Sequence, residues 1–222
     1  MIEIILDTET TGLKASEGHR IVEIGCIELN ELIPTKNKFH CYLNPERKVS
    51  EDAFKIHGYT DDFLSKQKKF AEIADEFLNF IKGKRLVIHN AGFDISHLNN
   101  ELKILGRDKI NEEIIDTLQI ARDKFPGSST SLDALCKRYG IDNSRREKHN
   151  AVLDCELLSK VYINLLDQRE PTLDLNVENN QNNQKVSNYN NKYFNKIIKP
   201  TEEELKLHKE YLKREIKKNY FN

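Results

Sequence analysis

The sequence predicts an α/β domain built on a mixed β-sheet. Apolar runs rich in isoleucine and valine come first, at residues 2–7, 20–29 and 38–43, with short connections between them. Strands in such close succession favour an antiparallel meander. Two later strand-like runs, 85–89 and 112–117, are separated by a segment with helical periodicity. Consecutive strands followed by strands that alternate with helices indicate one mixed five-stranded sheet flanked by helices.

Helices are predicted where apolar residues recur at helical spacing. In the first such segment, Phe70, Ile73 and Phe77 fall on one stripe. Later in the chain, Ser131 is placed to cap a helix that begins at Leu132. The predicted helices cover residues 70–81, 94–105, 131–139 and 150–166.

Composition divides the chain into three parts. Residues 1–168 have the pattern of a globular domain, whereas residues 176–195 contain nine asparagines and almost no aliphatic side chains. Such a segment cannot bury enough apolar surface to offset the chain entropy lost on folding. We therefore expect a flexible, disordered Asn-rich linker over 169–199 and renewed order over 200–222.

The last part of the chain has the features of a capped helix. Thr201 and Glu204 have the spacing of a capping box, and acidic residues precede basic ones, which suits the helix dipole. Leu205, Leu212 and Ile216 form a thin apolar stripe. Because a lone helix of this length is marginally stable in water, it is either a tether that docks on a partner or a solvated tail, and the stripe favours docking.

Charge and composition exclude several classes of protein. The 222 residues carry a formal net charge of −1, which argues against broad electrostatic coating of duplex DNA. No apolar run is long enough to span a membrane and no signal peptide is recognisable, so we expect a cytoplasmic protein. Four cysteines without CxxC spacing are expected to be reduced and buried: Cys26, Cys41, Cys136 and Cys155.

Two carboxylates stand at the end of the first apolar run, in the stretch LDTETTG. Asp7 and Glu9 are two positions apart, so in a strand their side chains point to the same face. With no cation between them they would repel each other and lose solvation. Either this strand end reaches water, where both acids are hydrated, or the pair forms part of a divalent-cation site.

Two further segments place acids where strands meet helices. HNAGFD follows a buried strand and puts Asp94 at the opening of a helix, where it could also serve simply as an N-cap. HNAVLD puts Asp154 on an amphipathic helix. His149 lies five residues earlier and shares a site with Asp154 only if it lies in the loop before that helix. Taken alone, His149 would be a surface loop histidine.

Together, four acids and one histidine predict metal-dependent phosphodiester hydrolysis. The residues are Asp7, Glu9, Asp94, His149 and Asp154. Hard carboxylate oxygens without clustered thiolates suit Mg²⁺ or Mn²⁺ rather than zinc. Paired cations about 4 Å apart stabilise both the attacking and the leaving oxygen of a phosphodiester. A histidine with a pKa near neutrality can take the proton of the attacking water.

The same three segments resemble the exonuclease motifs of the DEDD superfamily, in its histidine-bearing branch. Other stretches, among them FHCYLNPER, EDAFKIHG and FPGSSTSLDALCKRYGIDNS, resemble the epsilon family of proofreading subunits of bacterial DNA polymerase III, over residues 2–167. This resemblance implies a ribonuclease H-like fold. It also implies a 3′–5′ exonuclease that removes mispaired nucleotides from primer 3′ ends.

The resemblance implies roles for the five site residues. Asp7, Glu9 and Asp154 are expected to ligate two divalent cations, Mg²⁺ or Mn²⁺, and so to hold the substrate phosphate as well. Asp94 is expected to hold the water shell of the second cation, and His149 to act as the general base.

The resemblance also implies contacts to the terminal nucleotide from the segment EDAFKIHG. The residues concerned are Asp52, Ile56 and His57, with Ile56 as a packing surface for a base. Two features leave alternatives open. Asp52 is shorter than the glutamate typical of the family, and His57 before Gly58 is also the position of a helix-terminal histidine that the dipole favours.

Partners follow from the same resemblance. We expect the enzyme to act on DNA 3′ ends and to bind the alpha subunit of DNA polymerase III through its C-terminal tail. A theta-like subunit and the sliding clamp are further candidates. Residues 170–176 loosely resemble a clamp-binding peptide and could equally be linker.

Two other functions are compatible with the same site. A free-standing exonuclease that trims RNA ends or oligonucleotides would share the five residues, but it would have little use for a linker and a capped helix. A catalytically silent binding module on this fold would not need all five positions to be filled. The sequence therefore favours the proofreading enzyme.

Overall fold

The computed structural model describes residues 1–146, 148–167 and 200–215. The chain divides into two units, residues 1–175 and 176–222. The linker predicted over 169–199 and the clamp-like segment at 170–176 lie outside the described residues.

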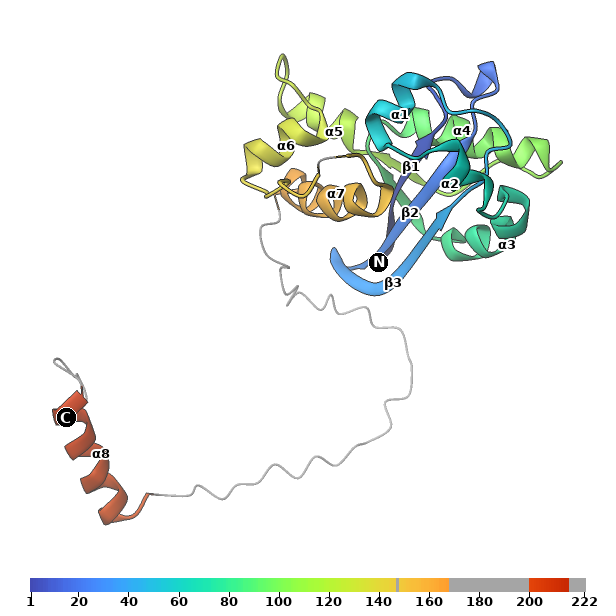
Figure 1. The fold of residues 1–222 in the computed structure, drawn as a ribbon. Coiled ribbons are helices and arrows are strands. Elements are labelled where there is room, and N and C mark those ends of the chain that lie inside the picture. The colour runs from blue at the N-terminus through green and yellow to red at the C-terminus, as the bar shows by residue number, and fades with distance from the viewer. Residues whose placement is uncertain (147, 168–199, 216–222) are drawn as a thin grey trace, which may run out of the picture. The chain divides into compact units, whose positions relative to one another are not determined.

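A mixed five-stranded sheet forms the centre of the first unit (Figure 1). The first three strands pair antiparallel, whereas β1 pairs with β4 and β4 with β5 in parallel, in the order β3-β2-β1-β4-β5. The predicted meander and mixed sheet are therefore confirmed. The strands are β1 (Ile2–Thr10), β2 (Ile21–Asn30), β3 (Ile33–Tyr42), β4 (Arg85–Ile88) and β5 (Ile114–Asp116).

Strand β3 begins earlier than its apolar pattern indicates. The prediction started at Lys38, but pairing with β2 already begins at Ile33. The first half of β3 is largely exposed, because this strand lies at the edge of the sheet and continues a hairpin. Backbone pairing rather than side-chain burial therefore decides where it begins.

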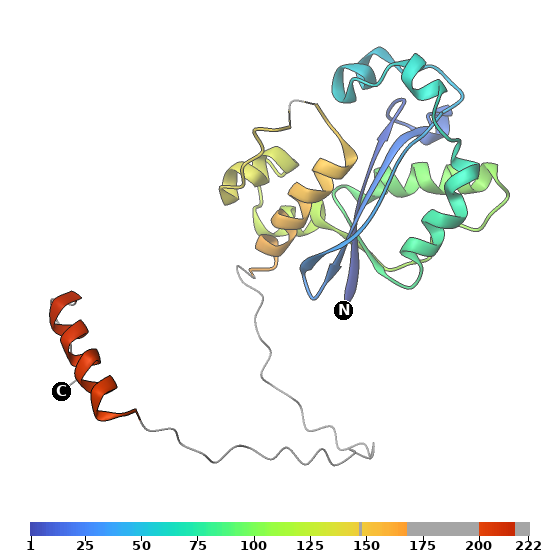
Figure 2. The same ribbon diagram turned by 60° about the horizontal axis from the view of Figure 1, so that its bottom comes forward.

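Helices cover both faces of the sheet. Figure 2 shows α3 and α4 on one face, α5, α6 and α7 on the other, and α1 and α2 beyond one end of the strands. The helices are α1 (Glu51–His57), α2 (Asp61–Ser65), α3 (Phe70–Ile81), α4 (Ala91–Ile104), α5 (Thr117–Lys124), α6 (Leu132–Tyr139) and α7 (Ala151–Leu165), with a 3-10 turn η1 (Ala15–Glu17). The short helix α5 carries too few apolar residues for periodicity to reveal it.

Side chains of β1 alternate between two separate cores. Ile4 and Leu6 pack into the cluster that includes residues of α3 and α4, whereas Ile5 packs into the cluster beneath α7. Because a strand has a period of two, Asp7 and Glu9 continue the face of Ile5, toward α7. The strand thus delivers both acids to one side of the sheet.

The second unit contains helix α8 (Glu202–Glu215). The Thr201 hydroxyl accepts from the backbone N–H of Glu204 at 3.3 Å, and the Glu204 carboxylate accepts from the N–H of Thr201 at 2.7 Å. This is the predicted capping box. Leu205, Leu207 and Tyr211 expose their side chains. Ile216, which was assigned to the apolar stripe, lies outside the described residues.

Two predictions from composition can be compared with the structure. All four cysteines are free thiols, and only Cys41 is partly accessible rather than buried. In the described part of the chain, none of the helices has both the length and the apolar character needed to traverse a bilayer.

A glycine sets the distance between β2 and α7. A Cβ atom added at Gly25 would lie 2.6 Å from the carbonyl carbon of Ala151 and 2.8 Å from the backbone nitrogen of Val152. Both neighbours are backbone in the first turn of α7, so they cannot move aside as a flexible side chain would. Gly25 therefore allows the start of α7 to lie directly on the sheet.

We expect Gly25→Ala to lower the free energy of unfolding by about 1–3 kcal/mol, because overpacking forces the backbone of α7 away from the sheet. Urea denaturation followed by circular dichroism measures this change. Gly92→Ala is the control: it lies in helix α4 and its added methyl group meets nothing within 4 Å. The control is expected to be neutral or to stabilise by about 0.5–1 kcal/mol. Equal unfolding midpoints for Gly25→Ala and wild type would contradict the close approach.

Candidate active site

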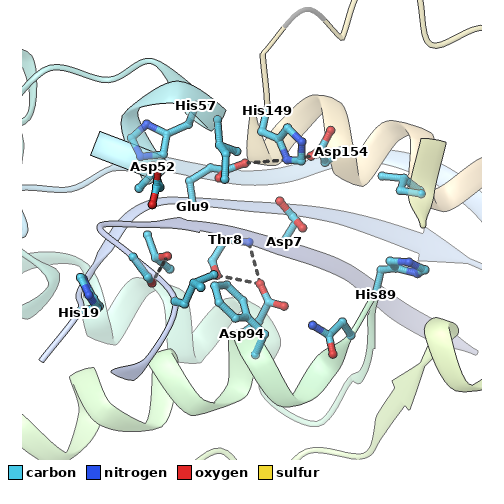
Figure 3. Close-up of a pocket in the computed structure, with 18 of the residues that line it drawn as sticks. Asp7, Thr8, Glu9, His19, Asp52, His57, His89, Asp94, His149 and Asp154 are labelled. Carbon is cyan, nitrogen blue, oxygen red and sulfur yellow. Dashed lines mark hydrogen bonds and ion pairs between the residues drawn. The ribbon is translucent and has the colours of Figure 1, made fainter. Parts of the chain in front are cut away.

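A pocket of about 800 Å³ lies at the C-terminal ends of β1 and β4. Figure 3 shows side chains from β1, from the segment after β4 and from the flanking helices around it. All eight side chains singled out in the sequence line this pocket: Asp7, Glu9, Asp52, Ile56, His57, Asp94, His149 and Asp154.

Three of these residues form a compact group. Glu9, His149 and Asp154 each offer a ligand atom, and these atoms lie within 4.8 Å of one another. The Nδ1 atom of His149 is 3.9 Å from Oε1 of Glu9 and 3.5 Å from Oδ2 of Asp154. His149 lies in the loop before α7, whose N-cap is Asn150. This loop position allows His149 to meet Asp154, which a continuous helix would prevent.

Asp94 reaches the pocket from the other face of the sheet. Helix α4 begins at Ala91 with Asn90 as N-cap, so Asp94 lies within the first turn and the N-cap alternative for it is wrong. Its Oδ1 atom accepts from the backbone N–H of Thr8 at 2.9 Å and from the Thr8 hydroxyl at 2.7 Å. Thr8 was not predicted as a site residue, although strand alternation places it opposite Asp7, on the side of α4.

Burial and mutual repulsion disturb the acids of this pocket. Burial, followed by the charges of Asp154, Glu23 and Asp94, raises the pKa of Glu9 to about 9. Burial and neighbouring carboxylates also raise the pKa of Asp7 well above its usual range. Burial raises the pKa of Asp94 to about 7, although the hydrogen bonds from Thr8 oppose this.

The donor set fits a divalent cation. Hard carboxylate oxygens and one imidazole converge in this group. Among the described residues that line the pocket, Arg146 is the single lysine or arginine, so the negative charge of the acids is only partly balanced. Acids whose raised pKa values keep them protonated would release those protons to solvent when a cation binds, and the cation would replace the repulsion by attraction. The residues present therefore suit Mg²⁺ or Mn²⁺.

Arg146 is a site residue that the sequence analysis did not identify. Its Nε and Nη2 atoms donate to the two carboxylate oxygens of Asp154 at 2.6 and 2.7 Å, and Nη1 donates to Asp133 at 2.7 Å. Nη2 also lies 3.0 Å from Nδ1 of His149. Burial and the charge of Arg146 lower the pKa of His149. An arginine in a loop without a motif gives no signal in the sequence.

The segment predicted to contact the terminal nucleotide lies along the same pocket. His57 is buried, its Nδ1 accepts from the N–H of Tyr59 at 3.0 Å, and its Nε2 has no hydrogen-bond partner among the described residues. Ile56 is 43% exposed, and the exposed Asp52 pairs with Lys55. The N–H of His149 donates to the carbonyl of Ile56 at 3.1 Å, so this segment and the histidine loop are joined.

A buried carboxylate behind the pocket fixes the start of α7. Glu23 is fully buried and accepts from the N–H of Ala151 at 3.0 Å and from the Asn150 side chain at 2.8 Å. The hydroxyl of Tyr59 and Nε2 of His40 donate to the same carboxylate, each at 2.8 Å. Glu23 was not predicted as a site residue; an acid within an apolar strand pattern is the signal in the sequence that could have indicated it.

Known structures with a similar fold are nucleases. Exonuclease X in complex with 5′ overhanging duplex DNA has a TM-score of 0.60 and 24% identity, over 75% of this chain and 92% of that chain. The nuclease domain of 3′hExo, a DEDDh family member bound to rAMP, has a TM-score of 0.66 and 19% identity, over 76% of this chain and 92% of that chain. At such identities these similarities concern the fold alone, and they confirm the ribonuclease H-like class.

Residues 4–162 match the protein family described as Exonuclease, so the chain belongs to that family of nucleases, which use divalent metal ions. The DNA polymerase III subunit epsilon of Rickettsia felis is 49% identical over 95% of this chain and 95% of its own length. The protein of the same name from Escherichia coli K12 is 49% identical over 72% of this chain and 70% of its own length. The chain is therefore a member of the DNA polymerase III epsilon family, and the predicted 3′–5′ proofreading exonuclease is confirmed.

The raised pKa values predict how stability depends on pH without metal. In EDTA, thermal stability should fall as pH rises from the ordinary pKa of Glu9, 4.5, to its folded-state value of about 9. The folded protein holds a proton that the unfolded chain releases in this window, so higher pH favours unfolding. Thermal melts across this range test the slope.

Two controls accompany these melts. Glu9→Gln should reduce the slope without abolishing it, because this side chain then has no proton to lose while Asp7 and Asp94 keep their raised pKa values. Saturating Mg²⁺ or Mn²⁺ should do the same, because the cation takes the place of the proton. A wild-type melting temperature in EDTA that stays constant or rises across the window would show that the pocket does not raise the pKa values of its acids.

Proposed function

We propose that this pocket hydrolyses the terminal phosphodiester of a DNA 3′ end with two bound divalent cations, as the proofreading subunit of DNA polymerase III. The observation that carries the proposal is the convergence of Glu9, His149 and Asp154 within 4.8 Å, in a pocket that Asp7 and Asp94 also line. When bound, the cations supply charge stabilisation for the attacking and the leaving oxygen.

The acids divide the work of holding the cations. Asp7, Glu9 and Asp154 would bind them directly, since all three reach the pocket from the face of α7. Asp94 would act through water from the opposite side of β1, where two hydrogen bonds from Thr8 fix one of its oxygens and leave the other free. The same ligands would orient the scissile phosphate between them.

His149 would be the general base. Its side chain is 45% exposed, so water and substrate can reach the imidazole. Its lowered pKa keeps the ring neutral at physiological pH and ready to accept the proton of the attacking water. The backbone hydrogen bond to Ile56 and the capped start of α7 hold the loop on both sides.

The neighbouring segment would hold the terminal nucleotide. Ile56 presents an exposed apolar surface on which a base can pack. His57 lies beside it, and its buried Nε2 would bond a polar atom of the substrate only after neighbouring side chains move aside. Asp52 would contact the sugar or phosphate through its exposed carboxylate. Selectivity for errors would then come from fraying, because a mismatched end separates from its template at lower cost than a paired one.

Helix α8 would attach the enzyme to the alpha subunit of the polymerase. Its exposed side chains Leu205, Leu207 and Tyr211 offer apolar surface that a partner could bury. A tethered exonuclease has a high effective concentration at the primer end. We further propose a theta-like subunit and the sliding clamp as partners. The enzyme would work in the cytoplasm, as part of the holoenzyme that carries the polymerase activity.

The alternative of a free-standing trimming exonuclease is less well supported. The similarity to the Rickettsia felis subunit extends over 95% of this chain and so includes the C-terminal part. The solved structure bound to rAMP, by contrast, shares 19% identity and bears on the fold alone. DNA is accordingly the proposed substrate.

We expect His149→Ala to lose at least about 100-fold in the rate of nucleotide release, the usual scale of a general base. Its affinity for Mn²⁺ should change little, because three carboxylates remain. Release of mononucleotides from a 3′-labelled primer and calorimetric Mn²⁺ titration measure the two quantities. His208→Ala, an exposed histidine on α8, is the matched control and should match wild type in this polymerase-free assay. Near wild-type turnover in His149→Ala would refute the role as base.

We expect Leu205→Glu combined with Leu212→Glu to reduce excision of a 3′ mismatch in the presence of polymerase, and to leave excision by the free enzyme unchanged. Charge on the apolar stripe should prevent α8 from docking, while the pocket is untouched. Lys206→Glu also adds an acid to this exposed helix, off the stripe, and is the control. If the double variant still copurifies with the alpha subunit at wild-type yield, α8 is not the docking element.

A further inference from the structure

We propose that Arg146 is a resident counter-cation of the metal-free site, which a divalent cation displaces from Asp154, and that Asp133 retains the arginine when it is displaced. The proposal rests on the metal-dependent function proposed above. It assigns a positioning role to two residues that contribute no ligand.

The contact between Arg146 and Asp154 is a buried bidentate pair. Nε lies 2.6 Å from Oδ1 and Nη2 lies 2.7 Å from Oδ2. The side chains are only 7% and 4% exposed, so the pair is shielded from solvent. Two parallel charge-assisted hydrogen bonds of this length are among the strongest that a carboxylate forms. Both oxygens of Asp154 are therefore engaged by the guanidinium of Arg146.

The same carboxylate belongs to the metal group. Oδ2 of Asp154 lies 3.5 Å from Nδ1 of His149 and belongs to the side chain that shares a ligand group with Glu9. Nη2 of Arg146 contacts both Oδ2 and Nδ1, at 2.7 and 3.0 Å. A divalent cation between Glu9 and Asp154 would therefore lie beside a guanidinium, and like charges at such short range repel strongly. One of the two cations has to move.

A second acid provides the place to which the arginine moves. Nη1 of Arg146 donates at 2.7 Å to Oδ2 of Asp133, which lies on helix α6 and is not part of the metal group. The Asp133 side chain is 55% exposed, and its other oxygen accepts from Asn143 at 2.8 Å. Arg146 can therefore give up Asp154 and keep a charged partner. Its departure also frees Nδ1 of His149, which links metal loading to the state of the proposed base.

Two substitutions separate this exchange from a purely structural role. Arg146→Gln removes the competing cation, so Mn²⁺ affinity should rise, on the order of tenfold for one repulsive charge in a partly shielded site. Its melting temperature in EDTA should fall, because Asp154 loses its partner. Asp133→Asn removes the alternative partner, so Arg146 stays on Asp154 and Mn²⁺ affinity should fall. If Arg146 and Asp133 only supported the structure of the site, both variants would bind Mn²⁺ more weakly than wild type.

Arg145→Gln is the matched control. It makes the same change of charge one position earlier, at a side chain that is 81% exposed and lies 4.0 Å from Glu156. Calorimetric titration of the full-length chains with Mn²⁺ alone, together with melts in EDTA, should show wild-type values for this control. A rise in affinity equal to that of Arg146→Gln would reduce the effect to net charge and overturn the exchange.

Wild-type protein gives an independent readout that does not depend on the folding of a variant. The Nε–H signal of Arg146 in nitrogen-15 NMR should shift when Mg²⁺ saturates the site, because the hydrogen bond to Asp154 is broken. An unchanged signal at saturation, or an Arg146→Gln chain that binds Mn²⁺ no more tightly than wild type, would overturn the proposal. Should wild type bind neither cation, the proposed metal-dependent function would itself fail.

Discussion

Repulsion among carboxylates gathered in one buried pocket is the constraint on which the rest of this structure depends. Glu9, Asp94 and Asp154 are all buried, and the pKa values of Glu9 and Asp94 are raised. Apolar side chains in place of such a cluster would make the domain more stable. The cluster costs the domain stability, in keeping with its membership of a nuclease family that uses divalent metal ions.

The fold meets this constraint by bringing the acids in from both faces of the sheet. Asp7 and Glu9 extend from β1 toward α7, whereas Asp94 comes from α4 and is fixed by Thr8 on the opposite side of the strand. Two well-packed cores lie behind these faces, so neither group of acids can relax away from the other. The packing of apolar side chains thus supports the strain at the strand ends.

Hydrogen bonds behind the pocket connect the loop that carries His149 to the sheet. Glu23 on β2 binds the N-cap region of α7, and the backbone of His149 is bonded to Ile56 at the end of α1. The proposed base and the proposed nucleotide-binding segment are therefore one connected unit. Gly25, two residues further along β2, lets α7 approach closely enough for these bonds to form.

Local patterns in the sequence determined much of this protein: the strands of the meander, the amphipathic helices, the caps at Ser131 and Thr201, and the motifs that carry the acids. These features arise from the spacing of side chains along the backbone, which can be read without knowledge of distant contacts. The edge strand β3 and short helix α5 were missed in part because their side chains carry little apolar periodicity.

Only the tertiary structure decided which residues support those motifs. Thr8 and Asp94 are 86 positions apart, and Glu23 and Asn150 are 127 apart, so their contacts depend on how helices fold back over the sheet. Arg146 belongs to the same class, since nothing in its neighbours along the chain indicates that its guanidinium enters the pocket. Spacing along one element specifies a face of a strand or helix, whereas the partner across the pocket is set by three-dimensional packing.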